Sequence, residues 1–186
     1  MGLSHIYMAL VHHPVYDKGR RVVTTSITNL DLHDLSRLAK TFGLGGLYIV
    51  QPSHLQAELA RRIIGHWEKG AGASYNETRR VAFAMIELVP SIEEMVKRVE
   101  EKTGREARLV ATTGRKHPGQ VDYRQGKKIL KDGSVSIIMF GTGWGLSDDL
   151  VTSSHMVLEP IVISDDYNHL SVRCAAAIII DRLFGK

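Results

Sequence analysis

Short, continuous apolar runs alternate with helical patterns along most of this 186-residue sequence. Residues 6–11, 46–50 and 135–140 are apolar at nearly every position, as in strands that are buried on both faces of a sheet. Between them, leucines recur at helical spacing, for example within residues 32–38. This alternation predicts an α/β fold with a mainly parallel sheet and helices on both faces. No internal repeat or linker interrupts it, so residues 1–186 are predicted to form a single domain.

Capping residues and glycines set the expected helix boundaries. Ser91 and Glu94 form a capping box. Thr28 or Asn29 can cap the first helix, which stops near Gly43. The closing helix is apolar on most faces, which predicts that it is buried or packs against a second subunit. The predicted helices are 28–43, 53–69, 76–89, 91–104, 146–153 and a closing helix from about residue 169, and further strands are predicted at 109–111 and 157–162.

Composition narrows the class of protein. No apolar run approaches the roughly 20 residues that span a bilayer, and the N-terminus lacks a signal-peptide pattern, which predicts a cytoplasmic location. A single cysteine excludes an internal disulfide, and Cys174, inside the apolar closing segment, is predicted to be a small core residue. The net charge of +4 favours a polyanionic partner.

Positive charge is concentrated between residues 113 and 128. This segment has five basic residues against one acid, Asp122, and it also contains glycines and a proline. It is predicted to be a mobile basic loop that can follow a phosphate backbone, helped by an arginine pair in an earlier turn. The candidate phosphate contacts are Arg20, Arg21, Arg115, Lys116, Arg124, Lys127 and Lys128.

Three segments punctuated by glycine or proline lie in the last third of the chain, each beside an apolar run. They are FGTGWGL at 140–146, LEPIVI at 158–163 and YNHLSVRCAAAIIIDRL at 167–183. Residues without a Cβ let peptide groups approach a flat ligand closely, so these segments predict a small-molecule site. A tight strand-to-helix turn with Trp144 packed on the core is the purely structural alternative.

Other chemistries find little support in the sequence. The glycines at 141 and 143 invite comparison with the dinucleotide fingerprint G-x-G-x-x-G, but Leu146 stands at the third glycine position and the motif comes late in the chain. A nucleotide-binding oxidoreductase is therefore a minor alternative. Nine histidines form no H-x-x-x-H or H-E-x-x-H pattern, so no metal site is predicted. A G-x-S-x-G nucleophile motif is also absent.

Four sequence blocks, near both ends of the chain, resemble one known family. They are His13-Pro14-Val15, Thr28-Asn29-Leu30-Asp31, FGTGWGL at 140–146 and YNHLSVR at 167–173. The resemblance is to the SPOUT superfamily of S-adenosylmethionine-dependent RNA methyltransferases, and within it to a small bacterial group of undefined substrate. It implies a C-terminal trefoil knot, S-adenosylmethionine as cofactor, tRNA or rRNA as substrate, and a homodimer.

The resemblance also implies which residues bind. Three backbone loops and the end of the preceding strand hold the cofactor in this superfamily, and the candidate phosphate contacts become candidate RNA-binding residues. The implied cofactor-binding residues are Thr112, Thr113, Phe140, Gly141, Thr142, Gly143, Trp144, Gly145, Leu146, Glu159, Pro160, Ile161, Asn168, His169, Leu170, Ser171 and Val172.

The candidate catalytic residues are Arg37, Asp31 and Asn29. Arg37 stands at the superfamily's arginine position, six residues before Gly43, but the position six residues earlier is Asp31 where the superfamily has asparagine. Arg37 is predicted to grip an RNA phosphate or to stabilise the acceptor, since a guanidinium does not give up its proton near neutral pH. Asp31, Asp34 or a substrate phosphate would then accept the proton.

The predicted function is S-adenosylmethionine-dependent methylation of RNA, at a ribose 2′-hydroxyl or a base nitrogen. The main alternative is a non-catalytic RNA-binding protein that keeps the knot fold, and Asp31 in place of asparagine is its support. The oxidoreductase is the third possibility.

Overall fold

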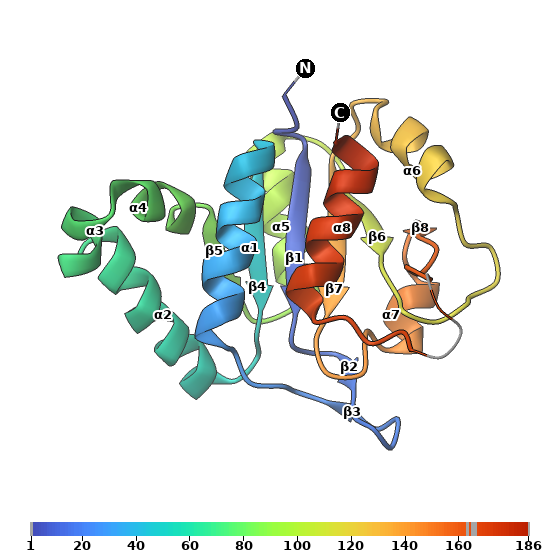
Figure 1. The fold of residues 1–186 in the computed structure, drawn as a ribbon, viewed down its shortest axis with the longest axis horizontal. Coiled ribbons are helices and arrows are strands. Elements are labelled where there is room, and N and C mark those ends of the chain that lie inside the picture. Colours follow the sequence, from blue (N-terminus) through green and yellow to red (C-terminus); the bar gives the residue numbers. More distant parts are fainter. Residues whose placement is uncertain (1, 163, 165–166, 186) are drawn as a thin grey trace.

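The structure, a computed structural model, describes residues 2–162, 164 and 167–185. Its centre is a parallel sheet with the strand order β5-β4-β1-β7-β6-β8 (Figure 1). A separate antiparallel hairpin pairs β2 with β3. The strands are β1 (Ile6–Val11), β2 (Val15–Tyr16), β3 (Val22–Val23), β4 (Gly46–Val50), β5 (Ile86–Val89), β6 (Arg108–Ala111), β7 (Ser136–Gly141) and β8 (Met156–Val157).

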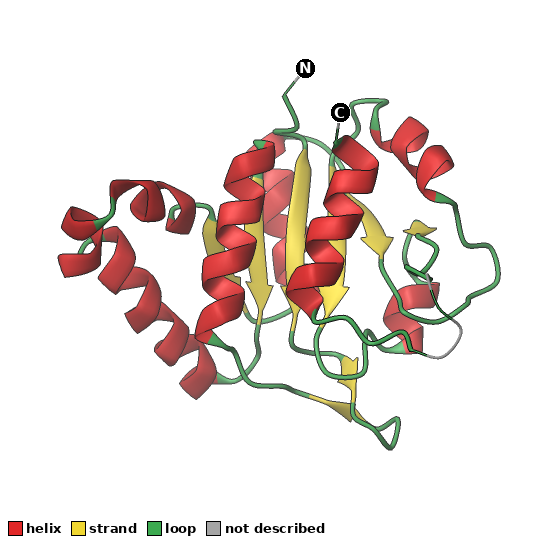
Figure 2. Ribbon diagram, in the orientation of Figure 1, coloured by secondary structure: helices red, strands yellow, loops and turns green. Residues whose placement is uncertain are grey.

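Helices cover both faces of the sheet, as predicted. Helices α1 and α8 cross one face side by side, and α5 lies behind the other (Figure 2). The helices are α1 (Asn29–Phe42), α2 (His54–Glu68), α3 (Ala71–Tyr75), α4 (Glu77–Phe83), α5 (Ile92–Thr103), α6 (Tyr123–Leu130), α7 (Asp148–Thr152) and α8 (Val172–Phe184).

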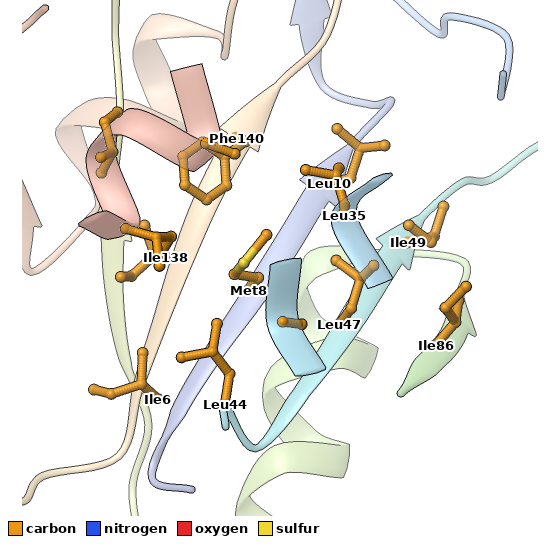
Figure 3. Packing of buried hydrophobic residues seen from close by; sticks show 14 of the residues in the cluster. Ile6, Met8, Leu10, Leu35, Leu44, Leu47, Ile49, Ile86, Ile138 and Phe140 are labelled. Carbon is orange, nitrogen blue, oxygen red and sulfur yellow. The ribbon is translucent and has the colours of Figure 1, made fainter. Parts of the chain in front are cut away.

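The central strand β1 explains this layering. Successive side chains of a strand point to opposite faces, and every residue of β1 is buried. Met8 and Leu10 enter the core beneath α1 and α8, where Leu35 of α1 and Phe140 of β7 also lie (Figure 3). The alternate residues, such as Ala9, enter the second core under α5 and α7. A strand that is apolar at every position therefore stabilises both layers.

Several predicted boundaries are confirmed by their caps. The Thr28 side chain accepts a hydrogen bond from the Asp31 N–H, and the Ser91 side chain accepts one from the Glu94 N–H. Gly43 ends α1 in the left-handed conformation, which costs glycine nothing.

Two predicted elements are wrong, and both concern the edges of the sheet. The helix predicted over 76–89 ends at Phe83, and residues 86–89 instead pair in parallel with β4 as an edge strand. The strand predicted over 157–162 stops at Val157, with Pro160 close behind. Proline has no N–H to offer a neighbouring strand.

Three further predictions are corrected. Part of the basic segment predicted as a mobile loop is α6, capped by the Asp122 side chain. The helix predicted over 146–153 is the shorter α7, and the closing helix begins at Val172 rather than near residue 169. Cys174 is exposed because the buried residues of α8, such as Ala176 and Ile180, lie on the opposite side of the helix.

The sheet topology determines where a ligand can sit. From β1 the chain moves outward through β4 to β5, and it returns on the other side through β6 and β7. The boundary between β1 and β7 is therefore a topological switch point, beside which ligands of parallel α/β sheets bind at the carboxyl ends of the strands. Within the described part of the chain, no helix has the length and apolar character needed to cross a membrane.

Candidate functional site

A cavity of about 960 Å³ opens at this switch point. The ends of β6 and β7 form its floor, the residues around the β2–β3 hairpin form one wall, and the chain leading into α8 forms the other. Cavities that bind small ligands usually measure about 300–1,000 Å³.

Most of the predicted cofactor-binding residues line this one cavity, although they come from three distant parts of the sequence. They are Thr112, Thr113, Phe140, Gly141, Thr142, Gly143, Trp144, Gly145, Ile161, Asn168, His169, Leu170, Ser171 and Val172.

Leu146, Glu159 and Pro160 are absent from the cavity lining. Leu146 is buried in the core under α5 and α7. Glu159 holds α6 in place, because its carboxylate accepts a hydrogen bond from the Tyr123 N–H and its carbonyl accepts one from the Tyr123 hydroxyl. The structure therefore gives Leu146 and Glu159 supporting positions behind the cavity.

The glycines of the 140–146 segment are required mainly by the protein's own packing. A Cβ on Gly141 would lie 2.5 Å from the Leu146 nitrogen, and one on Gly143 would lie 2.8 Å from the Tyr16 carbonyl oxygen. Gly143 and Gly145 also have positive φ angles of 58° and 94°. A side chain on Gly145 would meet no atom within 4 Å. The sequence suggested that these glycines allow a ligand to approach closely. That explanation fits Gly145, but Gly141 is required by packing within the protein.

Several peptide groups of this segment are already bonded within the protein. The Thr142 N–H donates to the Val11 carbonyl at 3.1 Å, and the Trp144 N–H donates to the Tyr16 carbonyl at 2.9 Å. The Tyr16 N–H in turn donates to the Gly145 carbonyl at 2.9 Å. The segment therefore contributes a fixed shape, and its Trp144 side chain is 52% exposed rather than packed on the core.

The chain before α8 closes over the other two segments. The Asn168 side-chain amide donates a hydrogen bond to the Gly114 carbonyl at 3.1 Å. The His169 ring meets the Trp144 ring edge-to-face, with 5.9 Å between their centroids. These contacts hold the ends of β6 and β7 against the C-terminal segment.

A partly buried chain of polar side chains supports the cavity floor. The His12 Nδ1 and the Thr25 hydroxyl lie 2.9 Å apart, and the Thr25 hydroxyl also contacts the hydroxyl of Thr142. His12 is fully buried, and its Nε2 atom has no hydrogen-bond partner among the described residues. Burial lowers the pKa of His12 to about 4, so its ring is neutral near pH 7.

The three candidate catalytic residues do not come together. Asp31 lines the cavity and is only 6% exposed, whereas Asn29 and Arg37 are not part of the lining. Arg37 is exposed on α1. It lies six residues beyond Asp31, or about 9 Å further along the helix axis.

Arg173 of α8 lies beside Asp31 and Asp34. Its Nε lies 3.4 Å from a carboxylate oxygen of Asp31, and its Nη1 lies 3.3 Å from one of Asp34. This pair of contacts ties the beginning of α8 to the beginning of α1 at the edge of the cavity.

The predicted RNA-binding residues divide into two groups. Arg20 and Arg115 line the cavity, and Lys116 lines a smaller one beside it. Arg21 binds Asp17 on the hairpin surface. The three residues on α6, which are Arg124, Lys127 and Lys128, lie outside both cavities, and Lys127 donates to the Gly185 carbonyl at the end of α8.

One wall of the cavity was missed by the sequence analysis. It comes largely from the hairpin and the segment that leads into α1, and two of the missed residues belong to α8. The threonines and the turn after His13-Pro14-Val15 were the available signal. The missed lining residues are Tyr16, Asp17, Lys18, Thr25, Ser26, Thr28, Gly114, Ala175 and Ile179.

Residues 5–185 match the family model described as "SAM-dependent RNA methyltransferase". The chain is also 40% identical over 181 residues to a "tRNA (guanine-N(1)-)-methyltransferase" of Oleidesulfovibrio alaskensis, which covers 97% of this chain but 42% of that protein. An uncharacterised protein of Aquifex aeolicus is 38% identical over 184 residues, covering 98% of this chain and 90% of that protein.

Among solved structures, the SpoU methyltransferase AviRb of Streptomyces viridochromogenes, in complex with AdoMet, has a TM-score of 0.59 and 17% identity. The match covers 96% of this chain and 56% of AviRb. It confirms the predicted fold class, and the description of the matched family confirms the predicted cofactor, S-adenosylmethionine. Because the match extends over nearly the whole sequence, the chain belongs to the family of S-adenosylmethionine-dependent RNA methyltransferases.

Proposed function

We propose that this chain transfers the methyl group of S-adenosylmethionine to an RNA, either tRNA or rRNA, at a ribose hydroxyl or a base nitrogen. One observation carries the proposal. A single cavity gathers the predicted cofactor segments, the carboxylate of Asp31 and the guanidinium groups of Arg20 and Arg115. The Oleidesulfovibrio protein named as a tRNA (guanine-N(1)-)-methyltransferase is more than twice as long as this chain, so the acceptor nucleotide is left open.

The cavity suits an adenosine that carries a short charged chain. Phe140, Ile161 and Leu170 supply apolar surface, and Thr112 and Thr113 bring hydroxyl groups to the floor. A Cβ on Gly114 or Gly145 would meet no atom within 4 Å, so the backbone there borders open space. A flat base can approach such a backbone closely.

S-adenosylmethionine supplies a methyl group on a positively charged sulfur. The protein's task is to hold donor and acceptor in line, which can contribute several kcal/mol, or about 7–11 kcal/mol in the best-oriented intramolecular reactions. The rigid 140–146 segment and the clamp between Asn168 and Gly114 are suited to this task. Neither the segment nor the clamp has to gain or lose a proton for this.

Asp31 is the favoured proton acceptor. It is the candidate catalytic residue that lines the cavity, and the Nε atom of Arg173 lies 3.4 Å from its carboxylate. Arg37 is assigned to RNA binding rather than to the chemical step, since it lies further along α1, outside the cavity lining, and a guanidinium group is a poor proton acceptor.

Tritium-labelled methyl transfer from S-adenosylmethionine to bulk tRNA and rRNA tests the proposal. Asp31→Asn should lower turnover at least about 100-fold, the usual scale of a general base, while cofactor binding measured by calorimetry is kept. Asp34→Asn is the matched control, because Asp34 contacts the same Arg173 but does not line the cavity. Its turnover should stay within a few-fold of wild type.

A non-catalytic RNA-binding protein is the second candidate, favoured by the contact between Asp31 and Arg173. A wild-type protein that binds cofactor and RNA but incorporates no methyl group would support it and refute the methylation proposal. Mass spectrometry of nucleosides in RNA from cells with and without the protein would identify the acceptor.

The predicted homodimer, C-terminal trefoil knot and cytoplasmic location stay predictions. The dimer is supported by exposed apolar side chains on α1 and α2, where Leu30, Leu55 and Leu59 are more than 40% exposed. Contact with a second chain would remove these apolar side chains from water. Analytical ultracentrifugation would show a mass of two chains if this prediction is correct, and a mass of one chain if it is wrong.

A further inference from the structure

A smaller cavity of about 340 Å³ adjoins the first. Arg20, Thr113 and Arg115 line both cavities, so the two share a wall. The smaller cavity is also lined by Lys116 and by Asp148 at the beginning of α7. A group bound there would lie directly beside whatever occupies the larger cavity.

Two guanidinium groups converge on the carboxylate of Asp148. Arg20 contacts its Oδ2 atom, and Arg115 donates to its Oδ1 atom at 3.1 Å. The two arginines are distant in the sequence, one on the hairpin and one after β6. Each binds a different oxygen, so together they form a two-sided grip on one small anion.

An aromatic ring supports this grip. The guanidinium carbons of Arg20 and Arg115 lie 4.6 and 5.5 Å from the centroid of the Tyr16 ring. Cations within about 6 Å of a ring face are attracted to it. The Tyr16 hydroxyl also accepts a hydrogen bond from the Asp148 N–H at 3.1 Å. Both arginines are thus oriented by contacts other than Asp148 itself.

The hairpin that carries Arg20 is tied to the cofactor side of the cavity. Tyr16 exchanges two backbone hydrogen bonds with the 140–146 segment, through Gly145 and Trp144. Arg20 has a positive φ of 60°, a conformation uncommon for residues other than glycine, which fixes the turn that presents its side chain. The turn that carries Arg20 therefore has a fixed position relative to the 140–146 segment.

Asp148 can be exchanged for another anion at little cost. The side chains of Arg20, Arg115 and Asp148 are 54%, 41% and 53% exposed, and exposed ion pairs contribute little to stability. The three positive charges of Arg20, Arg115 and Lys116 also outnumber the single negative charge of Asp148. Carboxylate and phosphate oxygens match the same guanidinium geometry.

We propose that Arg20 and Arg115 form a seat for one backbone phosphate of the RNA, next to the acceptor nucleotide, and that Asp148 occupies this seat in the RNA-free protein. The inference rests on the proposed function and adds to it a defined phosphate site with a built-in competitor. The cofactor's own carboxylate has the same chemistry as the phosphate, so the experiment must separate the two anions.

The test measures the affinity of each variant for fluorescent oligouridine and for bulk tRNA over a range of salt concentrations, and its affinity for S-adenosylmethionine by calorimetry. Arg20→Ala and Arg115→Ala should each weaken RNA binding several-fold and reduce the salt slope by about 0.7, the value for one phosphate on a single strand. Asp148→Asn should tighten RNA binding several-fold at low salt, because the competing charge is gone.

Arg108→Ala is the matched control. Arg108 is an exposed arginine paired with one aspartate, Asp132, and it begins β6, the strand that leads toward Arg115. It lies outside both cavities. Its RNA affinity and salt slope should equal those of the wild type.

The proposed phosphate seat would be refuted if Arg20→Ala and Arg115→Ala bound RNA as tightly as the wild type. It would also be refuted if Asp148→Asn showed unchanged or weaker RNA affinity. A loss of S-adenosylmethionine affinity without a loss of RNA affinity would refute it as well, because the seat would then serve the cofactor's carboxylate. Failure of methyl transfer is a separate result, since a non-methylating protein with the predicted RNA affinities keeps the seat and loses the proposed function.

Discussion

Two walls of the same cavity are built in opposite ways. The 140–146 wall is held by buried strands and backbone hydrogen bonds, and Gly141 has no room for a side chain. The arginine wall, made by Arg20 and Arg115, is held by exposed ion pairs on Asp148. The first wall fixes a shape, whereas the second presents exposed charge.

This difference separates two kinds of mutational effect. Changes beneath or within the 140–146 wall should lower stability and cofactor affinity together, because the fold and the ligand use the same atoms. Changes in the arginine wall should leave stability nearly unchanged and alter RNA binding in a salt-dependent way. The predictions below test this separation.

The largest expected effect concerns His12, beneath the 140–146 wall. Burial lowers the pKa of His12 from 6.5 to about 4. Between about pH 6.5 and pH 4 the unfolded chain takes up a proton at His12 that the folded chain does not. The free energy of unfolding should therefore keep its full value above about pH 6.5. It should fall by up to about 3 kcal/mol as the pH drops to 4.

Urea unfolding at several pH values in this window measures the loss. His12→Asn, which has no titrating ring, should show a flatter dependence than the wild type. Identical pH dependence in the two proteins would refute the assignment to His12.

Gly141→Ala should destabilise the protein by about 1–3 kcal/mol, the usual cost of overpacking. The added methyl group would overlap the Leu146 backbone nitrogen. Gly114→Ala is the control in the same cavity, since its methyl group would meet no atom within 4 Å. Thermal unfolding compares the two, and equal melting temperatures would contradict the account of this wall.

Thr142→Val should cost about 1 kcal/mol, because the Thr142 hydroxyl donates to the Val11 carbonyl and contacts the Thr25 hydroxyl. Both partners are part of the support beneath the cavity. The change in the midpoint of urea unfolding measures this cost. A variant as stable as the wild type would show that the polar chain contributes nothing to the wall.

The smallest effect is expected for Arg115→Ala, which should change the free energy of unfolding by less than about 0.5 kcal/mol. Its ion pair with Asp148 is exposed on both sides. A stability loss comparable to that of Gly141→Ala would show that the two walls are not built differently, and would break the comparison.

The alternation of apolar runs was enough to predict the sheet and both helical layers. The central strands are apolar at nearly every position, which is typical of parallel strands covered on both faces. The edge strand β5 was missed because residues 86–89 follow a helix without a strong break. Its strand character comes from pairing with β4, which local sequence does not show.

Helix α6 was missed because Gly126 suggested a loop. In the structure a Cβ on Gly126 would lie 2.9 Å from a methyl carbon of Leu158, so the glycine allows close packing of the helix rather than breaking it. The same ambiguity applies to Gly141. Glycine in a sequence shows that space is short or the backbone unusual, but only tertiary contacts show which.

The cofactor segments were placed by resemblance, and the structure brings most of them to one cavity. The hairpin wall was missed because Tyr16 and Thr25 carry no motif of their own. Their position depends on backbone hydrogen bonds to Gly145 and to His12, which are distant from them in the sequence. Such long-range pairing cannot be read from local pattern.

The central claim is that the cavity between the 140–146 segment and residues 168–172 binds S-adenosylmethionine. A crystal structure of the protein grown with that cofactor tests it most directly. The account predicts an adenosine seated between these two segments, with the sulfonium side turned toward Asp31. A cofactor bound elsewhere, or a cavity closed by the protein's own side chains, would contradict it.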